Sequence, residues 1–381
     1  MSSPLRPLHV GKFLPPPFAG METHVDTLLR AIANESAPTL VASEPTGRQS
    51  HPLEGLPYRV ISVPYYGMVA SVPLCPGMLK AVRTEYRQGR ANLMHVHAPN
   101  PWGDMAILRA PKDLPVVMTW HSDIVRQRTL LRFYGSVQQA ALRRADRILV
   151  FTPNHYESSA QLHVERLDQK IEFVPIGIDF DALDNTLSDT RVQAELQQWV
   201  QGRPLILTVG RHVYYKGYNH LLAAMARLRS DAVLLMVGTG PLLADLQRQC
   251  QELGLGARVR FMGEVDRAAL VTALRQCDLF CLPSIERAEA FGIASAEAMA
   301  CGKPTVVCDL RNGVNFLNRA GETSLIAPPR DEAALADALD TLARDAGLRE
   351  RMGAAARAWV RARFDIAAMR EGTLALYRKL V

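Results

Sequence analysis

Two glutamates eight residues apart, Glu289 and Glu297, flank the step from a loop into a helix. A strand pattern ends at Leu282, and a helical pattern begins after Phe291-Gly292. Glu289 therefore lies in the loop, and Glu297 lies about one to two turns inside the helix. Carboxylates in these places can accept hydrogen bonds from the vicinal hydroxyls of a sugar or ribose ring. The alternative interpretation is a surface loop followed by a charged helix face.

Two cations upstream complete a possible site for a diphosphate. The strand pattern over 205–209 ends in Gly210-Arg211, and Lys216-Gly217 opens the next helix. Arginine offers a planar fork and lysine a mobile point charge. A nucleotide-sugar donor needs such cations, because its leaving group gathers negative charge in the transition state. The helix that Gly292 precedes also suits a phosphate, because its first N–H groups lack intrahelical partners.

Two further turns follow strands and precede helices. Gly238-Thr239-Gly240 is a fragment of a dinucleotide fingerprint, and we interpret Gly238 as part of a tight turn near the nucleotide. Phe18-Ala19-Gly20-Met21-Glu22 follows the first strand, and the amides near Gly20 could face the diphosphate from another domain. A purely structural turn remains the alternative there.

Histidines form two groups. His95 and His97 alternate at a strand end, but no carboxylate or cysteine of suitable spacing accompanies them, so we predict no metal site. His121 comes directly after the strand pattern over 116–119 and could contact a transferred sugar. A structural role is the alternative for this lone histidine.

These residues need a framework of parallel strands, and apolar strand patterns alternate with helical patterns along nearly the whole chain. We expect two doubly wound α/β domains facing across a cleft, with ligands beyond the carboxyl ends of the strands. The expected strands span residues 8–10, 39–42, 58–63, 93–96, 116–119, 147–151 and 171–174, then 205–209, 232–237, 259–262, 279–282, 305–308 and 324–326.

The polar stretch between the two series of strands, residues 181–203, is expected to be a linker. It separates a first domain over 1–180 from a second domain over 204–362. A final helix over 363–381 has apolar residues at helical spacing and could pack back on the first domain.

The composition is that of a globular protein, with 48% hydrophobic and 22% charged residues. No apolar run approaches the roughly 20 residues that span a bilayer, and the six cysteines lack zinc spacing. A cytoplasmic location is therefore expected.

Between residues 80 and 150 there are twelve Lys and Arg against five Asp and Glu, an excess that attracts phosphates of any kind. A solvated face is the alternative, and nucleic acid is disfavoured because the aromatic residues there form no base-stacking motif.

With these residues in place, the chain resembles glycosyltransferase family 4, whose members have the GT-B fold of two Rossmann-like domains. The resemblance is strongest in Gly210-Arg211 with Lys216-Gly217 and in the two glutamates eight residues apart. It implies a retaining hexosyl transfer that requires no metal or other cofactor. The residue roles that it implies are Arg211 and Lys216 on the donor diphosphate, Glu297 on the ribose, Glu289 on the transferred sugar, the amides of Phe291, Gly292 and Ile293 on sugar or phosphate, and His121 on the sugar. The N-terminal loop departs from the family, because Ala19 replaces the first of two glycines.

A narrower resemblance lies in the segments 120–127 and 309–316. They are similar to those of bacterial O-polysaccharide and common-antigen transferases that use GDP-mannose or GDP-rhamnose. This likeness implies a mannosyl or D-rhamnosyl donor and an acceptor saccharide on a lipid pyrophosphate. The segment 65–90 could then rest peripherally on the cytoplasmic face of the inner membrane. The alternatives are a UDP-sugar donor, a GT-B nucleotide-sugar epimerase, or a non-catalytic subunit that binds the sugar nucleotide.

Overall fold

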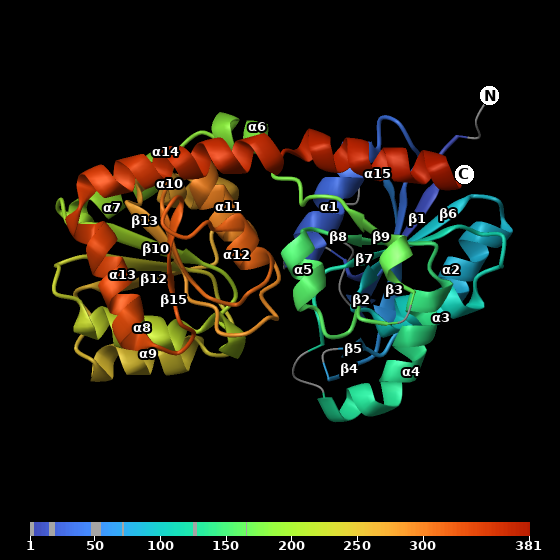
Figure 1. Cartoon of the computed structure of the whole chain (residues 1–381), viewed down its shortest axis with the longest axis horizontal. Helices are drawn as coiled ribbons and strands as arrows, with labels where there is room; N and C mark the ends of the chain where they lie inside the picture. The colour runs from blue at the N-terminus through green and yellow to red at the C-terminus, as the bar shows by residue number, and fades with distance from the viewer. Residues whose placement is uncertain (1–3, 15–19, 47–54, 71, 125–127, 165) are drawn as a thin grey trace. The chain divides into compact units, whose positions relative to one another are not determined.

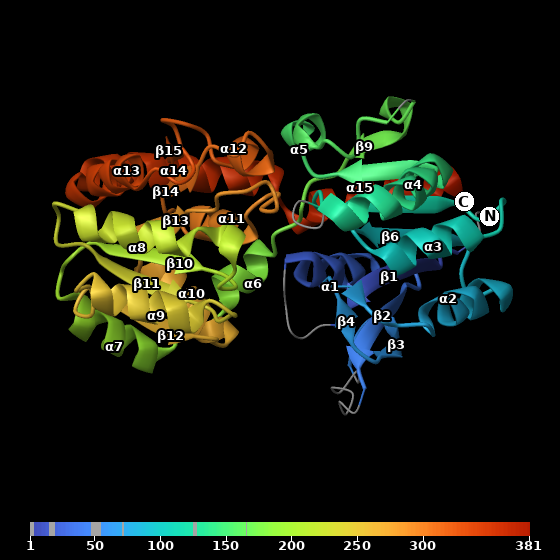
Figure 2. The same ribbon diagram turned by 90° about the horizontal axis from the view of Figure 1, so that it is seen from below.

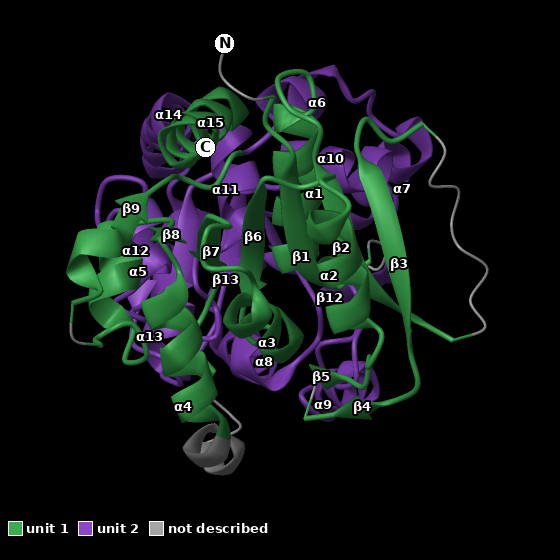
Figure 3. Ribbon diagram, turned by 90° about the vertical axis from the view of Figure 1, so that its right-hand side faces the viewer, with its two compact units in different colours: residues 1–177, 366–381 green, residues 178–365 purple. Residues whose placement is uncertain are grey.

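The chain forms two compact units, one of which is made of two separate segments (Figures 1 and 3). The computed structural model describes residues 4–14, 20–46, 55–70, 72–124, 128–164 and 166–381. The first unit comprises Met1–Gly177 and Ile366–Val381, and the second comprises Ile178–Asp365. Both are built on parallel sheets with helices on both faces (Figure 2).

The first unit has a seven-stranded parallel sheet in the order β3-β2-β1-β6-β7-β8-β9. Its strands are β1 (Pro7–Phe13), β2 (Thr39–Pro45), β3 (Arg59–Tyr65), β6 (Leu93–Ala98), β7 (Val116–Trp120), β8 (Arg147–Val150) and β9 (Ile171–Phe173), and β4 (Met68–Val69) and β5 (Val72–Pro73) form a separate antiparallel pair. Its helices are α1 (Gly20–Ile32), α2 (Met78–Arg87), α3 (Pro101–Arg109), α4 (Arg128–Arg144), α5 (Pro153–Ser158), the 3-10 turn η1 (Asp168–Lys170) and α15 (Ile366–Leu380).

Alternation along β6 divides the core of the first unit between the two faces of its sheet. Met94 and Val96 belong to the larger apolar cluster, which includes residues of α2, α3 and α4. Leu93 belongs to a cluster on the opposite face, with side chains of α1 and α15. The C-terminal helix α15 thus packs against α1 and covers one face of the sheet.

The second unit has a six-stranded parallel sheet in the order β12-β11-β10-β13-β14-β15. Its strands are β10 (Leu205–Val209), β11 (Val233–Val237), β12 (Val259–Gly263), β13 (Leu279–Leu282), β14 (Thr305–Cys308) and β15 (Ser324–Ala327). Its helices are α6 (Phe180–Asn185), α7 (Thr190–Val200), the 3-10 turn η2 (Tyr214–Lys216), α8 (Tyr218–Arg227), α9 (Leu243–Glu252), α10 (Arg267–Gln276), α11 (Ile293–Ala300), α12 (Gly313–Leu317), α13 (Glu332–Arg344) and α14 (Ala346–Arg363).

The expected strands are confirmed to within about three residues at each end, and the short pair β4 and β5 was not predicted. Residues 181–203, expected to be a linker, instead contribute most of α6 and α7 to the second unit. Asp179 and Asp189 accept hydrogen bonds from the first turns of these two helices, so acids that suggested a linker are N-caps. Arg275 ties α6 to α10 by donating to the carbonyl oxygens of Leu183 and Asp184.

No helix in the described part of the chain is long and apolar enough to cross a membrane.

Candidate functional site

The loops after β10 and β13 lie at the point where the strand order of the second sheet reverses. β10 pairs with β11 on one side and with β13 on the other. In open parallel sheets, ligands bind beyond the carboxyl ends of the strands at such a point. The loop after β10 carries Arg211 and Lys216, and the loop after β13 carries Glu289.

Gly217 allows these two loops to touch. Its φ of +68° is in the left-handed region, and a Cβ there would lie 2.2 Å from the carbonyl oxygen of Pro283. Directly beside this contact, the backbone N–H of Ile285 donates to the carbonyl of Tyr215 over 2.8 Å. Any residue other than glycine would force the loops apart.

The contact between the loops brings Lys216 and Glu289 together. The Lys216 Nζ lies 2.5 Å from Glu289 Oε2, and each side chain is only 11% exposed. Ser284 donates a second hydrogen bond to the same carboxylate oxygen over 3.0 Å. Two residues that the family resemblance assigns to the diphosphate and to the sugar therefore form an ion pair with one another.

The electrostatics of this pair keep the lysine charged. Burial alone would lower the pKa of Lys216, but the charge of Glu289, with smaller contributions from Tyr218 and Tyr215, outweighs it and raises that pKa. Burial raises the pKa of Tyr218 to about 12, so its phenol stays neutral. Lys216 therefore stays protonated throughout the physiological pH range.

Arg211 differs from Lys216 in being exposed. Among the described residues, no carboxylate forms an ion pair with it. Its guanidinium is thus available to an anion from solvent. Gly210 before it has a φ of +149°, and a Cβ there would lie 3.3 Å from the Lys216 Nζ, so this glycine leaves room for the lysine.

Gly238 has a packing role that the sequence did not reveal. A Cβ on Gly238 would lie 2.3 Å from the Gly210 carbonyl oxygen, and one on Gly240 would lie 2.5 Å from that of His212. The N–H of Gly210 donates to Val237 over 3.0 Å in the same contact. These glycines let the loops after β10 and β11 pack backbone against backbone.

Helix α11 begins at Ile293, shortly after Glu289. Gly292 is its N-cap in a left-handed conformation, with φ 86° and ψ 59°. Phe291 turns its ring into the core against Phe364, with centroids 5.1 Å apart, so only its backbone can serve a ligand. Ile293 is the first helical residue, and its N–H belongs to the first turn, where helices attract anions.

Glu297 lies in the second turn of α11 and has a partner that sequence reasoning missed. Arg267, the first residue of α10, places its Nη1 2.6 Å from Glu297 Oε1. The glutamate side chain is 15% exposed and the arginine 42%. No sequence pattern links residues on two different helices, and only the neighbourhood of α10 and α11 could have indicated this pair.

The segment 309–316, whose likeness suggested a GDP-sugar, acts on the loop that carries Glu289. Asn312 Nδ2 donates to the backbone carbonyl of Glu289 over 2.7 Å, and Asn312 Oδ1 caps α12. Asn315 Oδ1 accepts from the N–H groups of Leu310 and Arg311 over 2.8 and 2.7 Å. Both asparagines therefore fix loop geometry, a role that their types alone did not specify.

In the first unit, His121 follows β7 and is 8% exposed. The backbone N–H of His121 donates to the Ala98 carbonyl over 2.9 Å. The centroid of its ring lies 5.0 Å from that of the His24 ring on α1. Burial lowers the pKa of His121 well below 6.5, so the ring is neutral. Gly20 is the first residue of α1. Phe18 and Ala19, and residues 125–127 of the second resemblance segment, lie outside the described residues.

His95 and His97 lie on β6, with His97 directly before its last residue, and both are fully buried. They meet two histidines that the sequence analysis did not single out, His9 on β1 and His24 on α1. Two sets of three have ring nitrogens within 4.8 Å of one another, namely His9, His95, His97 and His24, His97, His121. The sequence showed no further metal ligand beside His95 and His97, whereas the fold brings histidines from other elements close to them. Hydrogen bonds between the rings already engage several of these nitrogens.

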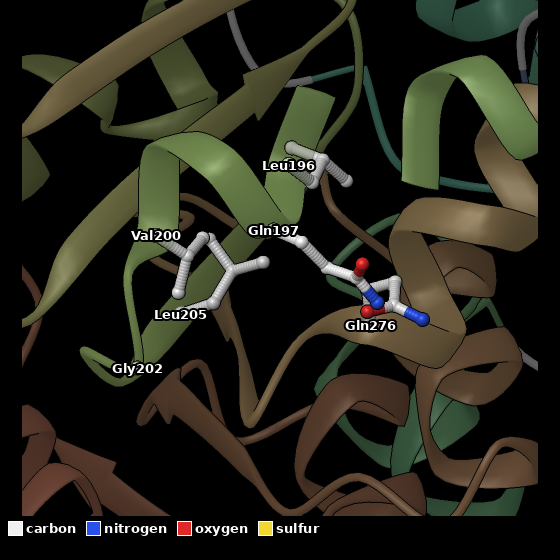
Figure 4. A pocket seen from close by; sticks show the side chains of 6 residues that line it. All are labelled: Leu196, Gln197, Val200, Gly202, Leu205 and Gln276. Carbon is white, nitrogen blue, oxygen red and sulfur yellow. The ribbon is translucent and has the colours of Figure 1, made fainter. Parts of the chain in front are cut away.

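A cavity of about 210 Å³ lies elsewhere in the second unit (Figure 4). It lies at the amino end of β10, whereas Arg211 and Lys216 follow the carboxyl end of that strand. No charged side chain lines it, so it does not suit a nucleotide diphosphate. Its lining residues are Leu196, Gln197, Val200, Gly202, Leu205 and Gln276.

Both halves of the chain match known glycosyltransferase families. Residues 18–182 match the Glycosyltransferase Family 4 model, and residues 190–359 match the model of Glycosyl transferases group 1. The D-rhamnosyltransferase WbpZ of Pseudomonas aeruginosa is 33% identical over 292 residues, which are 76% of this chain and 74% of that protein. The O-antigen chain mannosyltransferase C of Escherichia coli is 30% identical over 339 residues, 89% of this chain and 88% of that protein.

Among solved structures, the sucrose-phosphate synthase of Thermosynechococcus elongatus superposes with a TM-score of 0.81 at 22% identity, covering 98% of this chain and 99% of that one. That likeness concerns the fold, which is GT-B. The two family models and the relatives together show that the chain belongs to the family 4 glycosyltransferases.

Proposed function

We propose that this chain transfers a hexose, mannose or D-rhamnose, from a GDP-sugar to a saccharide on a lipid pyrophosphate, with retention of anomeric configuration. The observation that carries the proposal is the pair of Lys216 and Glu289 at the switch point of the second sheet. The names of the relatives, a D-rhamnosyltransferase and an O-antigen mannosyltransferase, support the choice of sugar.

In this proposal the donor diphosphate binds to Arg211, to Lys216 and to the first turn of α11. Lys216 then shares its charge between Glu289 and the phosphate. The Glu289 carboxylate, now less strongly bound to the lysine, accepts hydrogen bonds from the sugar hydroxyls. The Glu297 carboxylate accepts hydrogen bonds from the ribose hydroxyls. Arg211 and Lys216 are the two positive charges at the leaving group, and they stabilise the negative charge that develops there in the transition state. We therefore expect transfer without a metal.

Retention is proposed to follow a front-face path assisted by the departing phosphate. Glu289 is the carboxylate that this proposal assigns to the sugar, and it already accepts from Lys216 and Ser284. A carboxylate engaged in this way is a weak nucleophile. The anomeric configuration of the product, measured by proton NMR, tests retention, and an inverted linkage would overturn it. A covalent glycosyl-enzyme trapped on Glu289 would contradict the front-face path.

The donor is tested by thermal shift with GDP-mannose, GDP-D-rhamnose, UDP-glucose and UDP-N-acetylglucosamine. A ligand that binds only the native state raises its stability. We expect stabilisation by the GDP-sugars and transfer to a synthetic lipid-pyrophosphate saccharide. Stabilisation by UDP-sugars alone would select the UDP alternative. Conversion of the donor to an isomer without acceptor would select the epimerase.

A peripheral contact with the cytoplasmic face of the inner membrane is part of the proposal. The segment around β4 and β5 exposes large apolar side chains, and α2 follows it directly with basic residues on one exposed face. Apolar groups that enter the headgroup region and cations beside them together favour an anionic surface. The apolar side chains are Tyr66 (71% exposed), Met68 (55%), Val69 (55%) and Leu74 (45%), and the cations are Lys80, Arg83 and Arg87.

Cosedimentation with vesicles checks this contact. We expect binding to vesicles that contain phosphatidylglycerol and much weaker binding to pure phosphatidylcholine. The double substitution Met68→Ser with Val69→Ser should reduce binding, while Leu187→Ser, an exposed apolar residue of the second unit, should not. Equal sedimentation of the wild type with and without vesicles would remove the membrane from the proposal.

A further inference from the structure

A continuous chain of hydrogen bonds crosses the first unit from Thr119 to His121. All of its side chains are buried, and they come from three adjacent strands, from the residue directly after β7 and from the C-terminal helix. The successive links are Thr119 Oγ1 to His95 Nε2 (2.6 Å), His95 Nδ1 to Tyr377 Oη (2.5 Å), Tyr377 Oη to His9 Nε2 (3.2 Å), His9 Nδ1 to His97 Nε2 (3.0 Å) and His97 Nδ1 to His121 Nε2 (3.1 Å).

The sheet register explains why these rings meet. His9 on β1 lies opposite His95 on β6, and His97 on β6 lies opposite Thr119 on β7. Tyr377 reaches the same face from α15, whose apolar residues pack against that face of the sheet. The chain is therefore a product of the fold, and no single segment of the sequence contains it.

Each ring in the chain is neutral. Burial lowers the pKa of His9 to about 3. Burial, together with the neighbouring histidines, also lowers the pKa values of His95, His97 and His121 well below 6.5. A neutral imidazole has one N–H and one lone pair. The Tyr377 oxygen could accept from both His95 and His9, but its own buried O–H would then have no acceptor among the described residues. Every link therefore holds one proton, and all the links point in the same direction along the chain.

Thr119 decides the direction. Its side chain is 1% exposed, and His95 is the partner of its hydroxyl among the described residues. The hydroxyl proton has an acceptor only if it is donated to His95 Nε2. The opposite direction would leave a buried O–H without an acceptor, which is costly. Protons are therefore donated from Thr119 towards His121, and each histidine carries its proton on Nδ1.

We propose that this chain fixes His121 as the Nδ1–H tautomer and that His97 is the residue that positions it. Among the described residues, Nδ1 of His121 has no hydrogen-bond partner, and it is the nitrogen left to a ligand. His121 then donates a hydrogen bond to an oxygen atom of the transferred sugar and does not act as a base. This step rests on the proposed function, with His121 as a contact of the transferred sugar as the family resemblance implies.

The tautomer is measured without substrate by long-range proton–nitrogen correlation of the histidine rings in the wild-type protein. The expected spectrum shows His121, His97 and His9 protonated on Nδ1 and unprotonated on Nε2. A wild-type His121 protonated on Nε2 overturns the proposal. This readout requires no variant and no activity, so it stands even if the sugar assignment is wrong.

Two substitutions of His97 form a matched pair. His97→Asn keeps an N–H near the place of Nδ1, while His97→Leu removes it, and both remove the acceptor for His9. We expect His97→Asn to keep the Nδ1–H tautomer of His121 and most of the transfer activity. His97→Leu should show Nε2–H at His121 and a kcat/KM lower by about tenfold, the range of one neutral hydrogen bond. Equal losses in both variants, with the tautomer unchanged, would indicate a merely structural role.

Two further measurements separate the possible failures. If His121→Ala transfers sugar like the wild type, the proposed sugar contact fails while the tautomer result stands. Zinc is the rival occupant, because His24, His97 and His121 offer three close nitrogens. Zinc coordination at His97 Nδ1 would require removal of the proton that the chain places there. Unchanged ring spectra on addition of equimolar ZnCl₂ are expected, and tight binding with loss of the Nδ1–H signals would overturn the proposal.

Discussion

The side-chain amide of Asn312 donates a hydrogen bond to the backbone carbonyl of Glu289, with 2.7 Å between nitrogen and oxygen. The amide thereby fixes the backbone of a carboxylate whose side chain is already bound to Lys216 and Ser284. Glu289 is thus held at both its backbone and its side chain before any ligand arrives. Such preorganisation matters for transfer, because small displacements of a positioning group are expensive in rate.

Replacing Asn312 should therefore impair transfer beyond its effect on stability. Asn312→Ser keeps a good N-cap for α12 but is too short to reach Glu289, and we expect a loss of about tenfold in kcat with little change in melting temperature. Asn312→Ala should show the same kinetic loss and an additional destabilisation of about 1 kcal/mol. Steady-state kinetics and urea unfolding measure the two effects. Normal turnover in the serine variant would show that the amide does not position Glu289.

The ion pair of Lys216 and Glu289 gives a prediction in which stability and activity separate. Lys216→Met and Glu289→Gln each leave a mostly buried charge without its partner and should destabilise by about 2 kcal/mol. The double variant removes both charges and should recover much of that stability. Each variant, including the double one, should lose at least about a hundredfold in turnover.

A double-mutant cycle of unfolding free energies and turnover checks this prediction. The exposed Lys379→Met and Glu322→Gln serve as charge-matched controls, and they should change neither quantity appreciably. Wild-type-like transfer by Lys216→Met and Glu289→Gln would sink the donor-site assignment.

His155 gives a pH prediction for the first unit. It is 4% exposed, and neither ring nitrogen has a hydrogen-bond partner among the residues that the structure describes. Burial lowers its pKa to about 4, although Asp123 acts in the opposite direction. Because the folded pKa lies below the unfolded value of about 6.5, the stability that neutral His155 supplies is present above pH 6.5. This stability is lost as the pH falls from about 6.5 to about 4, because in this range the imidazole is protonated in the unfolded chain but not in the folded one.

Replacing this ring should flatten the acid side of the stability profile. Between pH 7 and pH 4 the free energy of unfolding should fall in both proteins. We expect the fall to be smaller in His155→Leu than in the wild type, by up to about 3 kcal/mol. Urea unfolding of both proteins at several pH values measures the difference, and pH 7 serves as the internal reference. Parallel profiles would contradict the assigned burial of His155.

Arg267 and Glu297 test the proposed ribose contact. The arginine is 42% exposed, so Arg267→Ala should change stability by less than about 0.5 kcal/mol. Because Arg267 occupies the carboxylate that the ribose would use, we expect its removal to lower the KM for the donor by about threefold with kcat unchanged. Glu297→Gln should raise the KM for the donor. Identical KM values in the wild type, Arg267→Ala and Glu297→Gln would show that Glu297 does not contact the donor.

The strands were the most predictable part of the molecule, because a parallel strand buried on both faces is a continuous apolar run. Leu205–Val209 and Leu279–Leu282 were predicted residue for residue for this reason. The helices α6 and α7 were missed because their capping residues, Asp179 and Asp189, also suit a polar linker. The pair β4 and β5 is too short for an alternating pattern to show.

The side chains of the candidate site were predicted by type but not by partner. Lys216 and Glu289 were each singled out, yet their mutual contact depends on Gly217 closing the space between two loops. Arg267 and Asn312 lie 30 and 23 residues from their partners, and only the strand order brings such pairs together. His9 was overlooked because a single histidine in a strand carries no signal until the neighbouring strand supplies another.

Tyr377 on α15 closes the hydrogen-bond chain of the first unit, although 282 residues separate it from His95. During synthesis the ribosome must therefore translate the whole second unit before the histidine-lined face of the first sheet can be covered. The second unit, which is continuous in sequence, can complete its own core earlier. A nascent chain arrested before α15 would carry a folded second unit and a first sheet with part of one apolar face exposed, a form that chaperones and proteases recognise.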